Sequence, residues 1–141
     1  MIQFTVYGEP VAQGRPRFTT VNGHAKAYDP AKSRDYKQYV RLVASQHKPD
    51  KPLEGALALQ VNIYRSIPKS FSKKKHTQAE NGEIRPTTKP DVDNFLKAIK
   101  DALKGIVWKD DSQVVSVMVN KWYSDQPRVE IVCYPIGEET A

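Results

Sequence analysis

Acidic side chains gather in two short stretches of this 141-residue sequence. The first contains Asp91 and Asp93, one residue apart, and the second contains Asp110 and Asp111. Carboxylate oxygens at this density are the ligands that Mg2+ or Mn2+ prefers. The 3 histidines lie far apart in dissimilar contexts and there is 1 cysteine, so the sequence does not favour a zinc site. The chemistry indicated is that of a divalent metal held by oxygen ligands.

These carboxylates belong to a basic chain with a formal net charge of +6. Clustered cations gain free energy by displacing counterions from a phosphate backbone, so this balance favours a nucleic acid partner. Candidate phosphate contacts flank the first acidic stretch in segments without apolar periodicity. They are Arg15, Arg17, Lys69, Lys73, Lys74, Lys75, Arg85 and Lys89. The alternative for each of them is a solvated surface position.

A purely structural interpretation of the first stretch also exists. Asp91 precedes a helical pattern and is suited to cap it, while Asp93 and Lys97 have the i, i+4 spacing of a helical ion pair. That interpretation does not explain why four carboxylates flank one helix in a basic protein.

The elements that must position these residues follow from periodicity and turn residues. Alternating apolar residues predict strands over 2–8, 56–65, 113–123 and 128–134. Helical spacing predicts helices from 31 to about 46 and from Asp91 or Asp93 to Lys104. Between the first strand and helix we expect a loop or loose hairpin with a turn at Asn22 and Gly23. The order β-α-β-α-β-β predicts one α+β domain over 1–141, a small mixed sheet with two main helices packed on it.

The remaining segments carry weaker signals. Residues 66–88 have no apolar periodicity and predict a long, flexible, basic loop, and 136–141 predict a frayed tail. A lone aromatic residue in a loop more commonly packs against its own domain than stacks on a nucleic acid base, and this is the expectation for Phe71. Cys133, between apolar residues, predicts a buried structural thiol and a reducing, cytoplasmic setting. No run approaches the length of a membrane span, and no leader is recognised.

Two ordered motifs carry a resemblance to a known family. One runs from Lys89 through Ala98 to Leu103 and contains Asp-x-Asp-Asn with a lysine four residues after the second Asp. The other, Trp108 to Val115, contains Asp-Asp-x-Gln-Val-Val. Together with Gly8–Val11 and Gly14–Phe18, these segments resemble the RusA-type Holliday junction resolvases over most of residues 1–135.

That resemblance implies a specific activity and site. The family's metal-binding carboxylates fall on Asp91, Asp93 and Asp111, its essential lysine falls on Lys97, and Asp110 is a neighbour without an assigned role. The implied activity is phosphodiester hydrolysis with Mg2+, or Mn2+ in its place. The implied partners are a second copy of the chain, as a homodimer, and four-way junction or other branched DNA nicked symmetrically. Recombination and repair in a bacterial or phage-infected cell are the implied setting.

The position of Asp111 raises a geometric question. A helix from Asp93 to Lys104 is roughly 17 Å long, so the chain must return to bring Asp111 to the other carboxylates. Either Ile106–Trp108 runs extended and antiparallel beside the helix, or Asp111 belongs to the partner subunit's site.

Two other classes of protein are also compatible with this sequence. One is a different Asp-x-Asp metalloenzyme, such as a Toprim-like nuclease or a nucleotide-sugar transferase, and these usually set the motif at a strand end. The other is a non-catalytic basic DNA-binding protein whose carboxylates only cap and pair.

Overall fold

The computed structural model describes residues 1–137, and a four-stranded sheet forms its centre. The strand order is β1-β6-β4-β5, from β1 (Ile2–Tyr7), β4 (Leu57–Ser66), β5 (Val114–Ser124) and β6 (Arg128–Pro135). β6 is antiparallel to both β1 and β4, whereas β4 and β5 run parallel. A parallel pair needs a crossover, and here α2 (Lys73–Glu80) and α3 (Val92–Leu103) lie within it.

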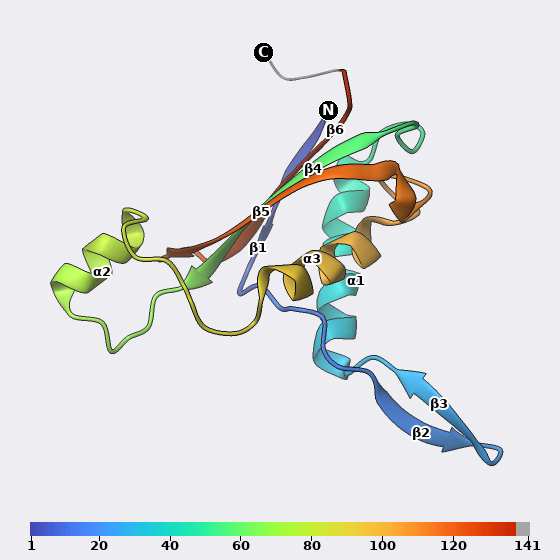
Figure 1. Ribbon diagram of the computed structural model, residues 1–141, viewed down its shortest axis with the longest axis horizontal. Helices are drawn as coiled ribbons and strands as arrows, with labels where there is room; N and C mark the ends of the chain where they lie inside the picture. The colour runs from blue at the N-terminus through green and yellow to red at the C-terminus, as the bar shows by residue number, and fades with distance from the viewer. Residues whose placement is uncertain (138–141) are drawn as a thin grey trace.

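Helices α1 (Ala31–His47) and α3 pack on one face of this sheet (Figure 1). The sequence pattern explains the packing, because alternate residues of β6 are buried and α3 buries one apolar stripe that includes Phe95 and Ile99. The predicted α+β class with two main helices on a mixed sheet is confirmed. Cys133 lies in this core, where burial raises the pKa of its thiol to about 11.

Two small elements project from opposite ends of the molecule (Figure 1). One is the hairpin of β2 (Arg17–Val21) and β3 (His24–Tyr28), and the other is α2. The hairpin turns at Asn22 and Gly23, whose φ angles of 52° and 79° are the positive values that a tight two-residue turn requires. The hairpin alternative for this segment is therefore confirmed.

The prediction that residues 66–88 form only a loop is wrong, because α2 lies within it. The helix buries a single side chain, Ala79, so its sequence has no apolar periodicity from which a helix could be predicted. Polar contacts hold it instead: the Ser72 hydroxyl accepts from the backbone N–H of Lys75, and His76 lies 2.7 Å from Asp125. Just before the helix, the Phe71 ring packs edge-on against Tyr123 of β5, as expected for a ring packed on its own domain.

Strand β5 forms one edge of the sheet, and its two halves differ. In the first half Val115, Val117 and Met118 are exposed by 62%, 43% and 59%. In the second half Arg85 stacks 3.5 Å over the ring of Trp122 and donates to the Lys121 carbonyl. The free edge is therefore the apolar first half.

The chain is still hydrogen-bonded just beyond β6. Of the predicted tail 136–141, Ile136 donates its backbone N–H to the Ala56 carbonyl, and 138–141 lie outside the described residues. Within residues 1–137 no helix is both long enough and apolar enough to cross a membrane.

Candidate metal centre and active site

Asp91 and Asp93 open helix α3 as exposed carboxylates. Asp91 occupies the N-cap position, yet its side chain makes no capping hydrogen bond. Asp93 lies in the first turn, and among residues 1–137 neither it nor Asp91 forms an ion pair, Lys97 included. The structural interpretation of cap and ion pair therefore lacks both of its bonds, and the two carboxylates are left available for a ligand.

The backbone leading into Asp91 is anchored by two cations of the sheet. Lys121 of β5 donates to the carbonyls of Thr88 and Pro90 at 2.9 and 3.0 Å, and Arg65 of β4 donates to the Lys89 carbonyl at 3.0 Å. Three successive carbonyls thus accept charge-assisted hydrogen bonds, which are stronger than neutral ones. The Lys89–Pro90 bond between them is cis.

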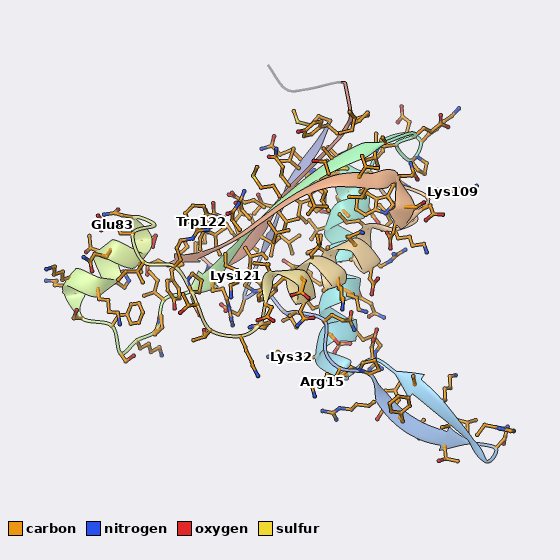
Figure 2. All side chains as sticks on the ribbon, viewed as in Figure 1. Arg15, Lys32, Glu83, Lys109, Lys121 and Trp122 are labelled. Carbon is orange, nitrogen blue, oxygen red and sulfur yellow. The ribbon has the colours of Figure 1, made fainter. Side chains whose placement is uncertain are left out.

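Sequence reasoning did not identify Lys121 or Arg65 as part of this site. Each sits near the end of a strand that is otherwise largely apolar or aromatic, and this was the available signal. A cation in such a position usually has a defined partner when it is partly buried. Figure 2 shows Lys121 beside the segment that enters α3.

The loop after β1 is tied to the same helix. The Gln13 backbone N–H donates to the Asn94 carbonyl at 3.0 Å. The Lys37 side chain is 13% exposed, and its ammonium donates to Gln13 Oε1, Asp29 Oδ2 and Asp101 Oδ2 at 2.7, 2.6 and 3.3 Å. The hydrogen bond from Lys37 holds the pKa of Asp29 below its ordinary value. This network, also missed from the sequence, joins α1, α3 and the loop.

Arg15 is brought to the carboxylates by that loop. It lines two adjoining hollows at the start of α3, of about 500 and about 300 Å³, and Asn94 lines both. Asp91 and Lys89 line the larger hollow, and Lys97 lines the smaller. Four of the residues singled out in the sequence therefore line these hollows: Arg15, Lys89, Asp91 and Lys97. Asp93 lies between Asp91 and Asn94 in the chain, in the first turn of α3.

Gly14 allows the loop to approach α1 this closely. A Cβ atom there would lie 2.9 Å from Pro30 Cγ and 3.3 Å from the Ser33 hydroxyl. Contacts this short require either the loop or its neighbours Pro30 and Ser33 to shift if a larger residue stands at position 14.

Asp110 and Asp111 lie at the other end of α3 and both have local partners. Asp110 accepts from the Ser112 backbone N–H in a capping box with Gln113, and this bond lowers the pKa of Asp110. Asp111 accepts from the indole Nε1 of Trp108, a fully buried residue, at 2.7 Å. Each carboxylate thus has a structural role that Asp91 and Asp93 lack.

The prediction that Ile106–Trp108 runs extended beside the helix is wrong. The chain coils instead, with Gly105 at φ 84° and hydrogen bonds from Val107 to Leu103 and from Gly105 to Trp108. Burial of Val107 and Trp108 in the core favours this turn over an extended return.

Consequently one chain does not bring the three predicted carboxylates together. Among residues 1–137 no three Asp, Glu, His or Cys side chains are grouped to hold a metal ion. Asp111 begins the short helical turn Asp111–Gln113, which leads into β5 at Val114. Lys121, which anchors the Asp91 segment, lies seven residues along that strand from Val114, about 23 Å at 3.3 Å per residue. Figure 2 shows Lys109 and Lys121 towards opposite ends of β5.

The other predicted phosphate contacts lie outside this region or are occupied. Arg17 belongs to the projecting hairpin, and Lys69, Lys73, Lys74 and Lys75 belong to α2 or its approach. The Lys75 ammonium lies 4.3 Å from the Phe71 ring centroid. The Arg85 guanidinium is already bound within the chain. It stacks on the Trp122 ring and donates to the Lys121 carbonyl and to Asn120 Oδ1.

Comparison with known proteins identifies the family to which the chain belongs. Residues 7–134 match the family described as Endodeoxyribonuclease RusA, and the chain belongs to that family. Among individual proteins it is similar to the "Uncharacterized protein YqaN" of Bacillus subtilis (strain 168). The two are 58% identical over 133 residues, which cover 93% of this chain and 94% of the relative. The resemblance identified from the motifs is thereby confirmed, and the family assigns the chain to the nucleases.

Proposed function

We propose that the protein is a Mg2+-dependent endonuclease that resolves Holliday junctions and related branched DNA by paired symmetric nicks, in recombination and repair. One observation carries the proposal. Asp91 and Asp93 are exposed and unpaired among the described residues, on a backbone anchored by hydrogen bonds from Lys121 and Arg65. Carboxylates kept free on a fixed backbone are suited to a ligand rather than to fold stability.

The donor set fits Mg2+. This ion is commonly bound by one or two carboxylates, with water and substrate phosphate completing its octahedron. Asp91 and Asp93 would hold it, and Mn2+, with the same oxygen preference, would replace it. When bound, such an ion lowers the pKa of a coordinated water and offsets charge on the scissile phosphate.

The cations around the carboxylates would position the DNA. Lys97 and Arg15 line the hollow beside Asn94, so a phosphate there lies between two positive side chains. Lys97, one turn after Asp93, would offset charge that develops on the phosphate during hydrolysis. Lys89 would contact the DNA backbone flanking the cleaved phosphate. Lys69, Lys73 and Lys74 would contact a more distant DNA arm of the junction.

A homodimer would complete the site with Asp111 from the partner subunit. The first half of β5 supports this, because it is a free sheet edge with exposed apolar residues, a surface that pairs readily with another strand. Antiparallel pairing about a two-fold axis at Ser116 sets position 111 of one subunit opposite position 121 of the other, each five residues from the axis. Lys121 anchors the Asp91 segment, so Asp111 would approach the carboxylates of the partner subunit.

Cleavage of a synthetic four-way junction tests the proposal. Wild type with Mg2+ is expected to make symmetric nicks in two opposed strands. Asp93→Asn is expected to bind the junction and cut it more than about 100-fold more slowly, since even groups that only orient a metal ligand contribute 10–100-fold. Asp35→Asn, which removes an exposed carboxylate of α1, is the matched control and should cut normally.

Two outcomes would contradict the proposal. Equal cleavage by wild type and Asp93→Asn would remove the catalytic assignment. Binding of the junction without cleavage by wild type, in either metal, would instead favour the non-catalytic DNA-binding protein.

A further inference from the structure

The hairpin of β2 and β3 has no partner within the described chain. All ten of its strand residues are exposed, and it projects away from the sheet and helices (Figures 1 and 2). The large apolar residue Phe18 is 73% exposed. An isolated two-stranded ribbon is marginally stable in water, so a ribbon of this kind gains stability when another molecule covers it.

The two faces of the hairpin differ in chemistry. Residues paired across an antiparallel ladder share a face. The pairs Arg17–Tyr28, Thr19–Lys26 and Val21–His24 therefore form one face, which contains every cationic side chain of the ribbon. The pairs Phe18–Ala27 and Thr20–Ala25 form the other, which carries no charge. We name these the basic face and the apolar face.

The charge of this region is of one sign. Residues 10–28 contain Arg15, Arg17 and Lys26 and no Asp or Glu. A protein partner would usually be met by charges of both signs, whereas a phosphate backbone is complementary to positive charge alone. The basic face therefore fits a nucleic acid.

The hairpin is also attached directly to the candidate active site. Arg15, two residues before β2, lines the hollow that contains Asp91. At the other end of the hairpin, Asp29 follows β3 directly and is bonded to Gln13 and Lys37. Both ends of the ribbon are thus fixed beside the carboxylates, while its tip extends roughly 17 Å away at 3.3 Å per residue.

We propose that the hairpin is a DNA-binding arm whose basic face lies along the duplex next to the cleaved phosphate. The major groove of B-DNA, about 12 Å wide, admits a two-stranded ribbon, and a length of roughly 17 Å corresponds to about five base pairs at 3.4 Å each. Arg17 and Lys26 contact phosphates, and Thr19, His24 and Tyr28 add hydrogen bonds. This inference rests on the proposed nuclease function for its site, but its test does not require cleavage.

Binding to plain duplex DNA in EDTA tests the arm separately from catalysis. The double variant Arg17→Gln, Lys26→Gln is expected to bind a 20-base-pair duplex about 10-fold more weakly near 0.1 M salt. The slope of log affinity against log salt should fall by about two, one for each phosphate that the variant no longer neutralises. The control is Lys48→Gln, Lys51→Gln, which removes the same charge from exposed positions beyond the far end of α1 and should bind like wild type.

A second measurement detects the contact without relying on affinity. Trypsin cleavage after Arg17 and Lys26 should slow when wild type is saturated with duplex DNA, because the basic face is then covered. Cleavage after Lys104, an exposed residue at the C-terminal end of α3 that is followed by Gly105, serves as the internal reference and should continue at its original rate.

Several results would contradict the proposal that the hairpin binds DNA. One is duplex affinity and salt slope unchanged in the double variant, and another is trypsin cleavage at Arg17 and Lys26 unaffected by DNA. A third is that Phe18→Ala, on the apolar face, disrupts self-association in sedimentation while the double variant binds DNA normally, since the hairpin would then dock a second copy. A wild type that binds duplex through the arm yet never cuts a junction would reject the proposed function and leave the arm supported.

Discussion

The two ends of helix α3 carry the same chemical group in opposite circumstances. At its start, Asp91 and Asp93 make neither a capping bond nor an ion pair among the described residues. Beyond its end, Asp110 caps a short helical turn and Asp111 accepts from the buried Trp108 indole. The difference separates carboxylates available to a ligand from carboxylates that already serve the fold.

The two regions are also fixed in different ways. The segment before Asp91 is fixed through its backbone, by Lys121 and Arg65, which leaves the acidic side chains free. Asp111 is fixed through its own side chain, with one oxygen bonded to Trp108. Its second oxygen remains to serve a metal, and the Trp108 bond would then orient the ligand, as partners of metal-binding carboxylates commonly do.

The largest expected effect comes from mixing two inactive variants. If Asp111 acts on the partner subunit's site, a heterodimer of Asp93→Asn with Asp111→Asn contains one intact site and one doubly defective site. Random mixing of equal amounts makes half of the dimers mixed, so single-strand nicking should return to about one quarter of the wild-type rate. If Asp111 acts within its own subunit, both sites stay defective and the mixture stays inactive, and this result would reject the shared site.

The edge of β5 gives the next effect. Val117→Lys places two like charges close to the proposed two-fold axis, where they repel, so the dimer should dissociate at least 10-fold more readily and nicking should fall in parallel. Sedimentation and the junction assay measure the two effects. Leu42→Lys, at an exposed apolar position of α1, is the control. Val117→Lys protein that remains dimeric and active would place the interface elsewhere.

Stability measurements in the absence of metal distinguish the two pairs of carboxylates directly. Asp111→Ala leaves the buried Trp108 N–H without its acceptor and should lower the free energy of unfolding by about 1–3 kcal/mol. Asp93→Ala removes no bond of this kind and should change it by less than about 0.5 kcal/mol. Urea titrations monitored by tryptophan fluorescence give both values. A larger decrease for Asp93→Ala would restore a structural role to that residue.

The smallest effect concerns Asp110 and pH. Its hydrogen bond from Ser112 lowers the pKa of Asp110 below the ordinary 3.8, so the ionised form stabilises the folded protein. That contribution is present above the ordinary pKa and is lost as pH falls through the lowered value. Asp110→Asn retains a capping oxygen but no charge, so its difference in stability from wild type should shrink as the solution is acidified below about pH 4. A difference independent of pH would contradict this.

Much of the fold was predictable because it depends on local periodicity. The alternation in β4 and β6 and the apolar stripe of α3 specify both the elements and the faces they bury. Helix α2 was not predictable in this way, since it buries only Ala79 and is held by contacts with Asp125 and Tyr123, about fifty residues away in the chain.

The sequence by itself determined the identity of the candidate site: Asp91, Asp93 and Lys97 in an ordered motif, with Asp111 following at a fixed spacing. Only the tertiary structure decided which of these residues meet. A helix of 12 residues, roughly 18 Å long, and a turn packed by Trp108 put Asp111 at the far end of α3, while the sheet supplies Lys121 and Arg65 to anchor the Asp91 segment. Spacing along a chain does not encode such distances, because they depend on where the core stops one element and turns the next.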